Sequence, residues 1–156
     1  MYKTIVVPLD SSERAEKILS HVGRLCDIKI GKVILLHVIE PTAFSPIALA
    51  SATRTAFMTP ESYAQQLEEM RASAEEYLAK IRSILKRRGI EAETLIEAGP
   101  AGERIVNVAE ERDADLIALA SHGRTGLSRV FFGGVAAAVL HRSEIPLLLV
   151  RSRDDV

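Results

Sequence analysis

Short apolar runs alternate with helix-like segments along this chain, and this alternation constrains the fold more than any other feature. Four of the five runs are apolar at nearly every position, which is typical of parallel strands covered on both faces. The third run is more mixed, as expected at or near a sheet edge. The runs cover residues 4–9 (TIVVPL), 32–39 (KVILLHVI), 92–98 (AETLIEA), 115–120 (DLIALA) and 145–150 (IPLLLV).

The segments between the runs carry the start and stop signals of helices. Asp10 and Glu13 have the spacing of a capping box ahead of a first helix that reaches residue 25. Thr59 and Pro60 are an N-cap and first-turn pair for the second helix, which Gly89 closes after three basic residues. The third expected helix starts at Gly99-Pro100 and passes Ala109, and the fourth runs from Gly133 to Arg142.

This order of elements predicts one α/β domain over residues 1–156, with a doubly wound parallel sheet and right-handed crossovers. We expect the strand order 3-2-1-4-5, with helices on both faces. Residues 40–59 form a long loop with two prolines and weak periodicity. A loop of this length is often functional, but a surface insertion fits the sequence equally well.

Composition narrows the classes of protein. Apolar residues make up 47% and charged residues 26% of the chain, which is typical of a globular protein. The net charge of −1 provides no basic field for nucleic acid. The single cysteine, Cys26, excludes an internal disulfide and favours a reducing compartment. No apolar run approaches the ~20 residues of a membrane span, so we expect a soluble, cytoplasmic protein.

Topology predicts where a ligand binds. In an open α/β sheet, ligands bind beyond the carboxyl ends of the strands, at the point where the strand order reverses. With the first strand central, this point lies between the first and fourth strands. The residues expected there are Pro8, Leu9 and Asp10 after the first strand, and Ala120, Ser121, His122 and Gly123 after the fourth.

A glycine-bearing loop joins the fourth strand to the fourth helix at this same place. The backbone N–H groups of Gly133, Gly134 and Val135 open that helix, where the positive end of the helix dipole suits a phosphate group. Arg124 and Arg129 could neutralise phosphate or be solvated loop charges. The chain has no Walker lysine pattern, and a plain tight turn is the alternative interpretation.

Around these residues the chain resembles the nucleotide-binding branch of the universal stress protein family. The family pattern G-x2-G-x9-G-[ST] matches the spacing of Ala120, Gly123, Gly133 and Gly134. Alanine replaces the first glycine, and Gly134 replaces the serine or threonine. The resemblance extends to IVVPLDSSE, LLHVIEP, AGPAGERIV, ADLIALASHGRTGLSRVFFG and IPLLLVR, and so covers nearly the whole chain.

The resemblance implies an adenine nucleotide hydrolase-like fold and a ligand such as ATP or another adenine nucleotide, with or without Mg²⁺. It implies that Asp10 and Val38 flank the adenine and that Ala120 lies near the ribose. Gly123, Gly133, Gly134 and Val135 would contact phosphate through their backbones. It also implies a homodimer through the last strand, from Ile145 to Val150, whose apolar edge invites antiparallel pairing with its copy.

Three functions stay open at this point. The first is a nucleotide-binding regulatory protein of the stress response, and the second is a slow ATPase. The third is a dimeric interaction module with no nucleotide, which Ala120 and Gly134 favour in part. His122 has no neighbouring carboxylate in the sequence to orient it as a base, so we expect weak hydrolysis at most. The four histidines lack metal-ligand spacing, and His37 is expected to be a satisfied, buried histidine near a strand end rather than a ligand.

Overall fold

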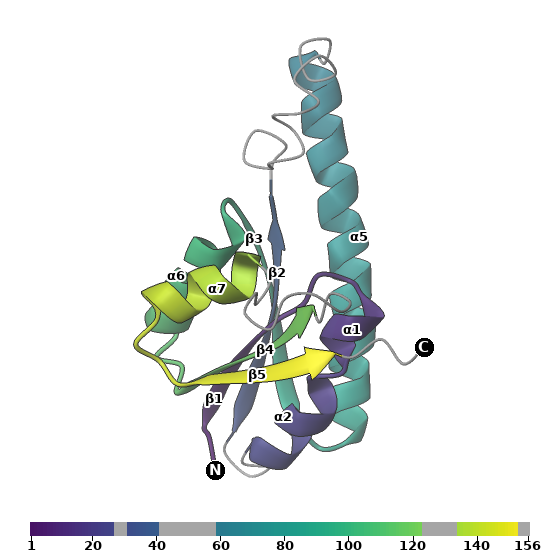
Figure 1. Cartoon of the computed structure of the whole chain (residues 1–156). Helices are drawn as coiled ribbons and strands as arrows, with labels where there is room; N and C mark the ends of the chain where they lie inside the picture. Colours follow the sequence, from purple (N-terminus) through teal and green to yellow (C-terminus); the bar gives the residue numbers. More distant parts are fainter. Residues whose placement is uncertain (27–30, 41–58, 123–133, 153–156) are drawn as a thin grey trace.

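One parallel sheet of five strands, in the order β3-β2-β1-β4-β5, forms the centre of the molecule (Figure 1). The computed structural model describes residues 1–26, 31–40, 59–122 and 134–152. The strand order and the α/β class predicted from the sequence are confirmed. The strands are β1 (Thr4–Pro8), β2 (Lys32–Ile39), β3 (Glu91–Ala98), β4 (Leu116–His122) and β5 (Leu147–Ser152).

Helices cover both faces of the sheet (Figure 1). One face carries three helices, and the other face carries two that pack on each other. The first group is α1 (Glu13–Glu16), α2 (Leu19–Leu25) and α5 (Pro60–Arg87), and the second is α6 (Ala101–Glu111) and α7 (Gly134–Arg142).

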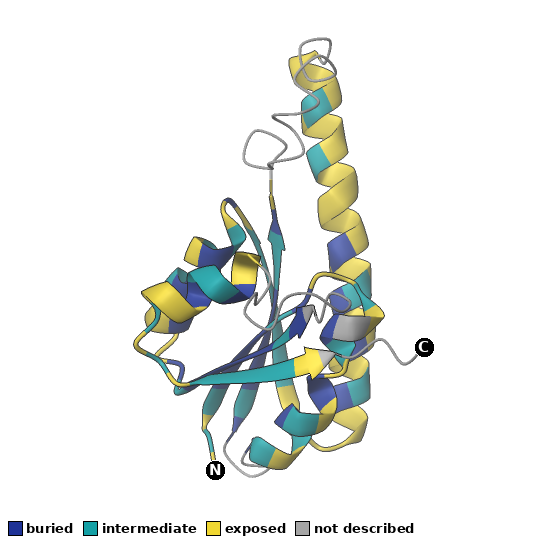
Figure 2. Ribbon diagram, viewed as in Figure 1, coloured by how far each residue is buried: buried dark blue, intermediate teal, exposed yellow. Residues whose placement is uncertain are grey.

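The core consists of two apolar layers, because successive strand residues point to opposite faces of the sheet. Ile5 and Val7 of β1 belong to the layer under α1, α2 and α5, whereas Val6 belongs to the layer under α6 and α7. All three side chains are fully buried. Figure 2 shows the same burial along the central strands. This double coverage is why the strands read as continuous apolar runs.

The central strand β1 is joined unequally to its two neighbours. Five residue pairs register β1 with β2, but only two, Ile5 with Leu116 and Val6 with Ile117, register β1 with β4. At the amino ends of β1 and β4, the Asp115 carboxylate accepts hydrogen bonds from the backbone N–H groups of Lys3 (2.9 Å) and Thr4 (3.0 Å). Asp115 therefore fixes the amino ends of β1 and β4 together, but the hydrogen-bonded ladder between the two strands is short.

The long helix α5 has the ends that the sequence predicts. Thr59 Oγ1 accepts a hydrogen bond from Ser62 N (3.1 Å), Pro60 is the first helical residue, and Gly89 has a φ of 76°. The first half of α5 extends beyond the sheet, and none of the helix residues before Ala74 is buried (Figure 2). No helix in the described ranges combines the length and the apolarity required to cross a bilayer.

The prediction of a single first helix capped by Asp10 is wrong. Two short helices, α1 and α2, occupy this region, and the chain makes a tighter turn between them, where Ile18 N donates to Ala15 O (3.3 Å). The cap of α1 is Ser12, whose Oγ accepts from Ala15 N (3.1 Å). Asp10 lies two residues earlier and instead binds Ser12, because Ser11 turns the chain with a φ of 66°.

Other boundaries differ by one or two residues. β3 begins at Glu91, and β4 and β5 continue to His122 and Ser152. β5 begins at Leu147, so Ile145 and Pro146 precede the strand. The predicted start of the fourth helix, Gly133, and most of the predicted loop 40–59 lie outside the described residues.

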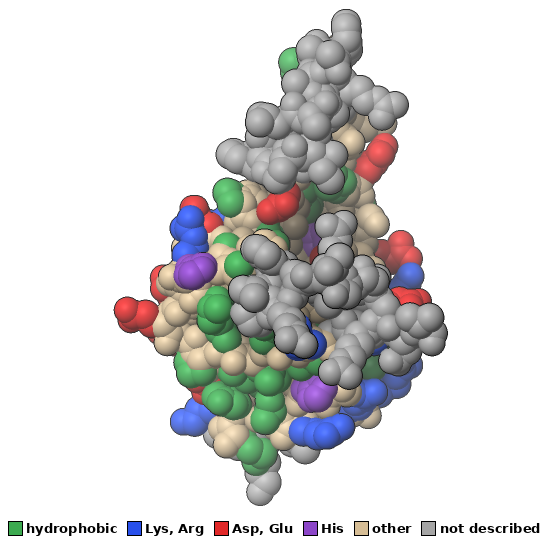
Figure 3. Space-filling view, viewed as in Figure 1, with side chains coloured by type: hydrophobic (Ala, Val, Ile, Leu, Met, Phe, Trp, Pro, Cys, Tyr) green, Lys and Arg blue, Asp and Glu red, His purple; other side chains and the backbone are tan. Residues whose placement is uncertain are grey.

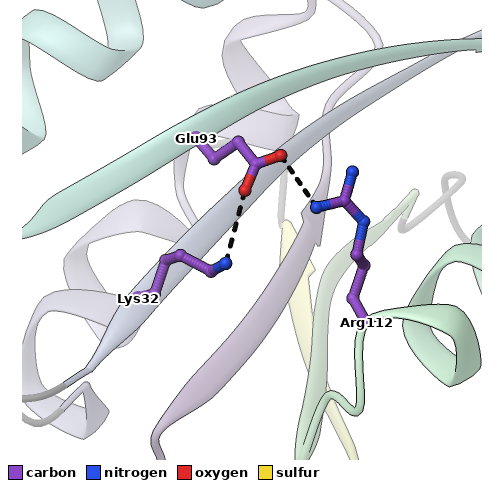
Figure 4. Close-up of polar contacts among 3 residues, drawn as sticks. All are labelled: Lys32, Glu93 and Arg112. Carbon is purple, nitrogen blue, oxygen red and sulfur yellow. Dashed lines mark hydrogen bonds and ion pairs between the residues drawn. The ribbon is translucent and has the colours of Figure 1, made fainter.

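Ion pairs cover the outer strand β3. The Glu93 carboxylate contacts Lys32 Nζ of β2 (3.3 Å) and an Arg112 guanidinium nitrogen at the end of α6 (3.0 Å), as Figure 4 shows. Glu97 pairs in the same way with Arg104 of α6 (2.7 Å). Each partly exposed pair contributes at most about 1 kcal/mol, but together they place charge along this edge.

Helices α6 and α7 pack closely where Gly102 faces Ala138. A Cβ atom added to Gly102 of α6 would lie 2.5 Å from the Cβ of Ala138 on α7. Real Cβ atoms do not approach this closely, so the glycine sets the distance between the two helices.

We expect Gly102→Ala to lower the free energy of unfolding by about 1–3 kcal/mol, because the added methyl group overpacks this contact. Urea denaturation of the parent, Gly102→Ala, Ala138→Gly and the double variant measures the effect. The double variant should lose at least about 1 kcal/mol less than the two single losses added together. Simple additivity would mean that the contact is not tight.

Candidate functional site

A cavity of about 440 Å³ opens at the carboxyl ends of β1 and β4, where the strand order reverses. Its volume lies within the usual range for small-molecule sites. Eight residues that the sequence analysis selected line it together: Pro8, Leu9, Asp10, Val38, Ala120, Ser121, Gly134 and Val135.

Sequence reasoning missed the apolar wall of the cavity. Leu36 of β2, Leu119 of β4, Ile105 of α6 and Ala136 of α7 also line it, and all belong to the core layer under α6 and α7. They look like ordinary core residues in the sequence. Leu36 could have been found, because it lies two residues before Val38 and so shares its face of the strand. Ser12, Ala15 and Ala101 complete the lining.

The structure does not test the remaining predicted site residues. His122 is the last residue of β4 and pairs in register with Ser152, but its side chain is not described. Gly123, Arg124, Arg129 and Gly133 lie outside the described residues, so their roles stay predictions.

The floor of the cavity is held by backbone and histidine hydrogen bonds. Leu9 N donates to Leu36 O (2.8 Å), and His37 Nδ1 lies 2.8 Å from Leu9 O. Because a carbonyl oxygen only accepts, Nδ1 of His37 carries the proton. The predicted hydrogen-bonding of His37 is confirmed, but the residue is half-buried rather than buried, because it lies near the end of β2. Both polar backbone groups of Leu9 are thereby tied to β2.

The turn after β1 presents the Asp10 carboxylate at the cavity. Asp10 Oδ1 accepts from Ser12 N (3.0 Å) and from the Ser12 hydroxyl (2.5 Å), so the side chain is oriented before any ligand arrives. Asp10 is exposed and can meet a polar group of a ligand.

Tyr77 of α5 lies near this turn. Burial, followed by the nearby carboxylates of Glu16 and Asp10, raises the pKa of Tyr77 well above its ordinary value. Its buried hydroxyl finds no hydrogen-bond partner among the described residues. The phenol therefore stays neutral and adds no negative charge beside Asp10.

The start of α6 is positioned from three directions. Gly99 has a φ of 135°, and a side chain there would meet Arg104 at 3.2 Å. Arg104 reaches back to Glu97, and Ala101 N donates to Glu40 Oε1 (3.0 Å). These contacts bring Ala101 to the cavity wall.

The start of α7 is open by comparison. A Cβ atom on Gly134 would find no atom of the described residues within 4 Å, and no acidic residue lies in the first turn of α7 as described from Gly134 onwards. An apolar wall beside a helix start suits a ligand with a flat apolar part and an anionic group.

Comparison with known proteins agrees with this geometry. The model of the Universal stress protein family matches residues 1–151. Universal stress protein MJ0577 of Methanocaldococcus jannaschii is 31% identical over 158 residues, covering 99% of this chain and 98% of the relative.

Solved structures give the same result. A structure of MJ0577 superposes with a TM-score of 0.78 at 30% identity and 99% coverage of both chains. A universal stress protein in complex with cAMP gives a TM-score of 0.64 at 21% identity, covering 96% of each chain. That from Archaeoglobus fulgidus in complex with dAMP gives 0.64 at 22%, covering 96% of this chain and 98% of the other. The last two likenesses concern the fold alone.

Loss of the Ser12 cap should destabilise the protein. We expect Ser12→Ala to lower the free energy of unfolding by about 1 kcal/mol, because Ala15 N loses its acceptor. Asp10→Asn keeps an oxygen for Ser12 and should change stability by less than about 0.5 kcal/mol. Urea denaturation measures the free energy of unfolding of both variants. A larger loss in Asp10→Asn than in Ser12→Ala would mean that Asp10 is the cap.

Proposed function

This chain belongs to the universal stress protein family, and we propose that it is a regulatory protein of the stress response that binds an adenine nucleotide. The observation that carries the proposal is the cavity, where Asp10, Val38, Ala120 and Gly134 come together from four separate segments. The relatives solved with cAMP and dAMP make an adenine nucleotide the ligand to test first.

The lining suits the parts of such a ligand. The adenine would lie between Asp10 and Val38, against the apolar wall of Leu36 and Ile105. The ribose would lie near Ala120, and the phosphates would approach the backbone at Gly134 and Val135. Asp10 could also meet a water molecule bound to Mg²⁺. A cytoplasmic setting is part of the proposal, since the chain has one cysteine and that residue is buried.

The two departures from the family motif are compatible with binding. Ala120 lies inside β4 and is not among the described non-glycine residues with positive φ, so its backbone conformation does not demand glycine. Gly134 lacks a hydroxyl group, which weakens a phosphate site that is otherwise built from backbone groups. No atom of the described residues stands within 4 Å of a Cβ at Gly134, so none of them would block that hydroxyl.

We also propose a homodimer through β5. The outer strand β3 is covered by the ion pairs of Glu93 and Glu97, whereas β5 has no charged residue between Leu147 and Val150. These four side chains are only half-buried, and Figure 3 shows hydrophobic side chains gathered over this part of the molecule. An uncharged edge strand favours antiparallel pairing with a second copy.

Restoring the hydroxyl at position 134 should strengthen nucleotide binding. We expect Gly134→Ser to bind Mg-ATP at least about fivefold more tightly than the parent, since a hydrogen bond to a charged group contributes about 1 kcal/mol or more. Gly134→Ala is the matched control, because it adds the same Cβ without the hydroxyl and is the better helix former, so a gain found only in Gly134→Ser comes from the hydroxyl. Isothermal titration calorimetry measures all three proteins.

Native mass spectrometry of the freshly purified parent should also show a bound adenine nucleotide. Absence of binding in the parent, in Gly134→Ser and in Gly134→Ser with Ala120→Gly would refute the nucleotide proposal. Binding by the double variant alone would mean that the parent has lost the site through these two positions.

Proline at the outer side of β5 should produce monomers. Ile117 N donates to Pro146 O, so regular parallel pairing directs the N–H of residue 148 towards β4 and that of Leu149 outwards. Leu149→Pro removes an outward donor and should give a folded monomer in sedimentation velocity. Leu149→Val keeps the donor and should stay dimeric. A folded Leu149→Pro dimer, or a monomeric parent, would contradict this interface.

A further inference from the structure

Two helix starts border the cavity, and they differ in charge. Ala101 at the start of α6 and Gly134 at the start of α7 both line it. Each helix start has unpaired N–H groups and a positive dipole end, so each attracts an anion in principle. A ligand with one anionic end could therefore lie in the cavity in either of two directions.

We propose that Glu40 is the specificity-determining residue that closes the α6 start to anions and thereby sets the direction of the ligand. The proposal rests on the nucleotide-binding function proposed above. Glu40 follows β2 directly, and its Oε1 accepts a hydrogen bond from Ala101 N at 3.0 Å. The exposed carboxylate thus places a negative charge at this helix start and repels a phosphate group, whereas an anion can displace a neutral side chain from the same place.

The local backbone makes this contact necessary. The residue that precedes α6 is Pro100, which has no side-chain hydrogen bond to the helix. The chain reaches Pro100 through Gly99, whose N–H donates to Ile39 O (3.0 Å). This bond brings the end of β2 beside the helix start and places Glu40 next to Ala101. A distant residue in the sequence therefore supplies the cap that Pro100 cannot.

A second acidic residue at the start of α6 adds to the repulsion of anions by Glu40. Glu103 lies in the first turn of α6, so two carboxylates compensate its positive end. The first turn of α7 has no acidic residue. A phosphate group is repelled from the first helix start and attracted to the second, while the uncharged ring takes the side of Val38 and Ile105. Glu40 acts on direction without itself lining the cavity.

Removing the charge of Glu40 should open a second anion position. Glu40→Gln keeps an oxygen acceptor for Ala101 N but removes the negative charge. We expect its affinity for inorganic tripolyphosphate to rise about fivefold over the parent, which is the effect of one charge near a helix start. Its affinity for adenosine should stay within about twofold, because adenosine has no anionic end.

Amide chemical shifts locate the bound anion. In ¹⁵N-labelled parent, tripolyphosphate should shift the signals of Gly134 and Val135. In Glu40→Gln it should shift those of Ala101 and Gly102 as well. Glu103→Gln is the matched control, because it removes the same charge from the first turn of α6, where its partner is Arg142 (3.7 Å) rather than the cavity. This variant should gain less than about twofold.

The outcomes separate the two proposals. Failure of the parent to bind ATP would refute the nucleotide function, while a gain for tripolyphosphate at Ala101 in Glu40→Gln would still support the role of Glu40. An unchanged affinity in Glu40→Gln, or an equal gain in Glu103→Gln, would overturn that role. Glu40→Ala, which removes both charge and acceptor, should show the same gain with a lower thermal midpoint because Ala101 N loses its cap.

Discussion

The burial of the middle of β1, from Ile5 to Val7, is the constraint on which the rest of the structure depends. Its side chains are enclosed by two apolar layers, and its two edges are occupied by β2 and β4. The chain must therefore leave β1 towards one side of the sheet and return later on the other side. This reversal separates the carboxyl ends of β1 and β4 and creates the cavity. The burial of β1 and the position of the candidate site therefore follow from the same strand order.

Much of the fold and part of the site could be predicted from the sequence, for identifiable reasons. Continuous apolar runs indicated strands covered on both faces, and Thr59 and Gly89 marked the ends of α5. Asp10 was mistaken for a cap because aspartate and serine both cap helices, and only the positive φ of Ser11 decides between Asp10 and Ser12. Leu36 and Ile105 escaped notice because a cavity wall and a core have the same composition.

The glycine motif predicted the site from its spacing, and the topology predicted the same place independently. Their agreement at Ala120 matters more than either signal alone, since glycines before a helix are common. The contribution of Glu40 could not be predicted, because it joins residues 61 positions apart through one hydrogen bond. Family membership accounts for the fold, whereas Ala120 and Gly134 depart from the family motif.

The short ladder between β1 and β4 has a thermodynamic consequence. β1, β2 and β3 are paired along most of their length, while two registered pairs and the Asp115 contacts join the backbones of β1 and β4. Both apolar layers span this junction, but its backbone ladder is the shortest described in the sheet. A molecule held by Val38 on one side and Ala120 on the other acts as a cross-link, and its free energy of binding adds to the work required to separate the two strands.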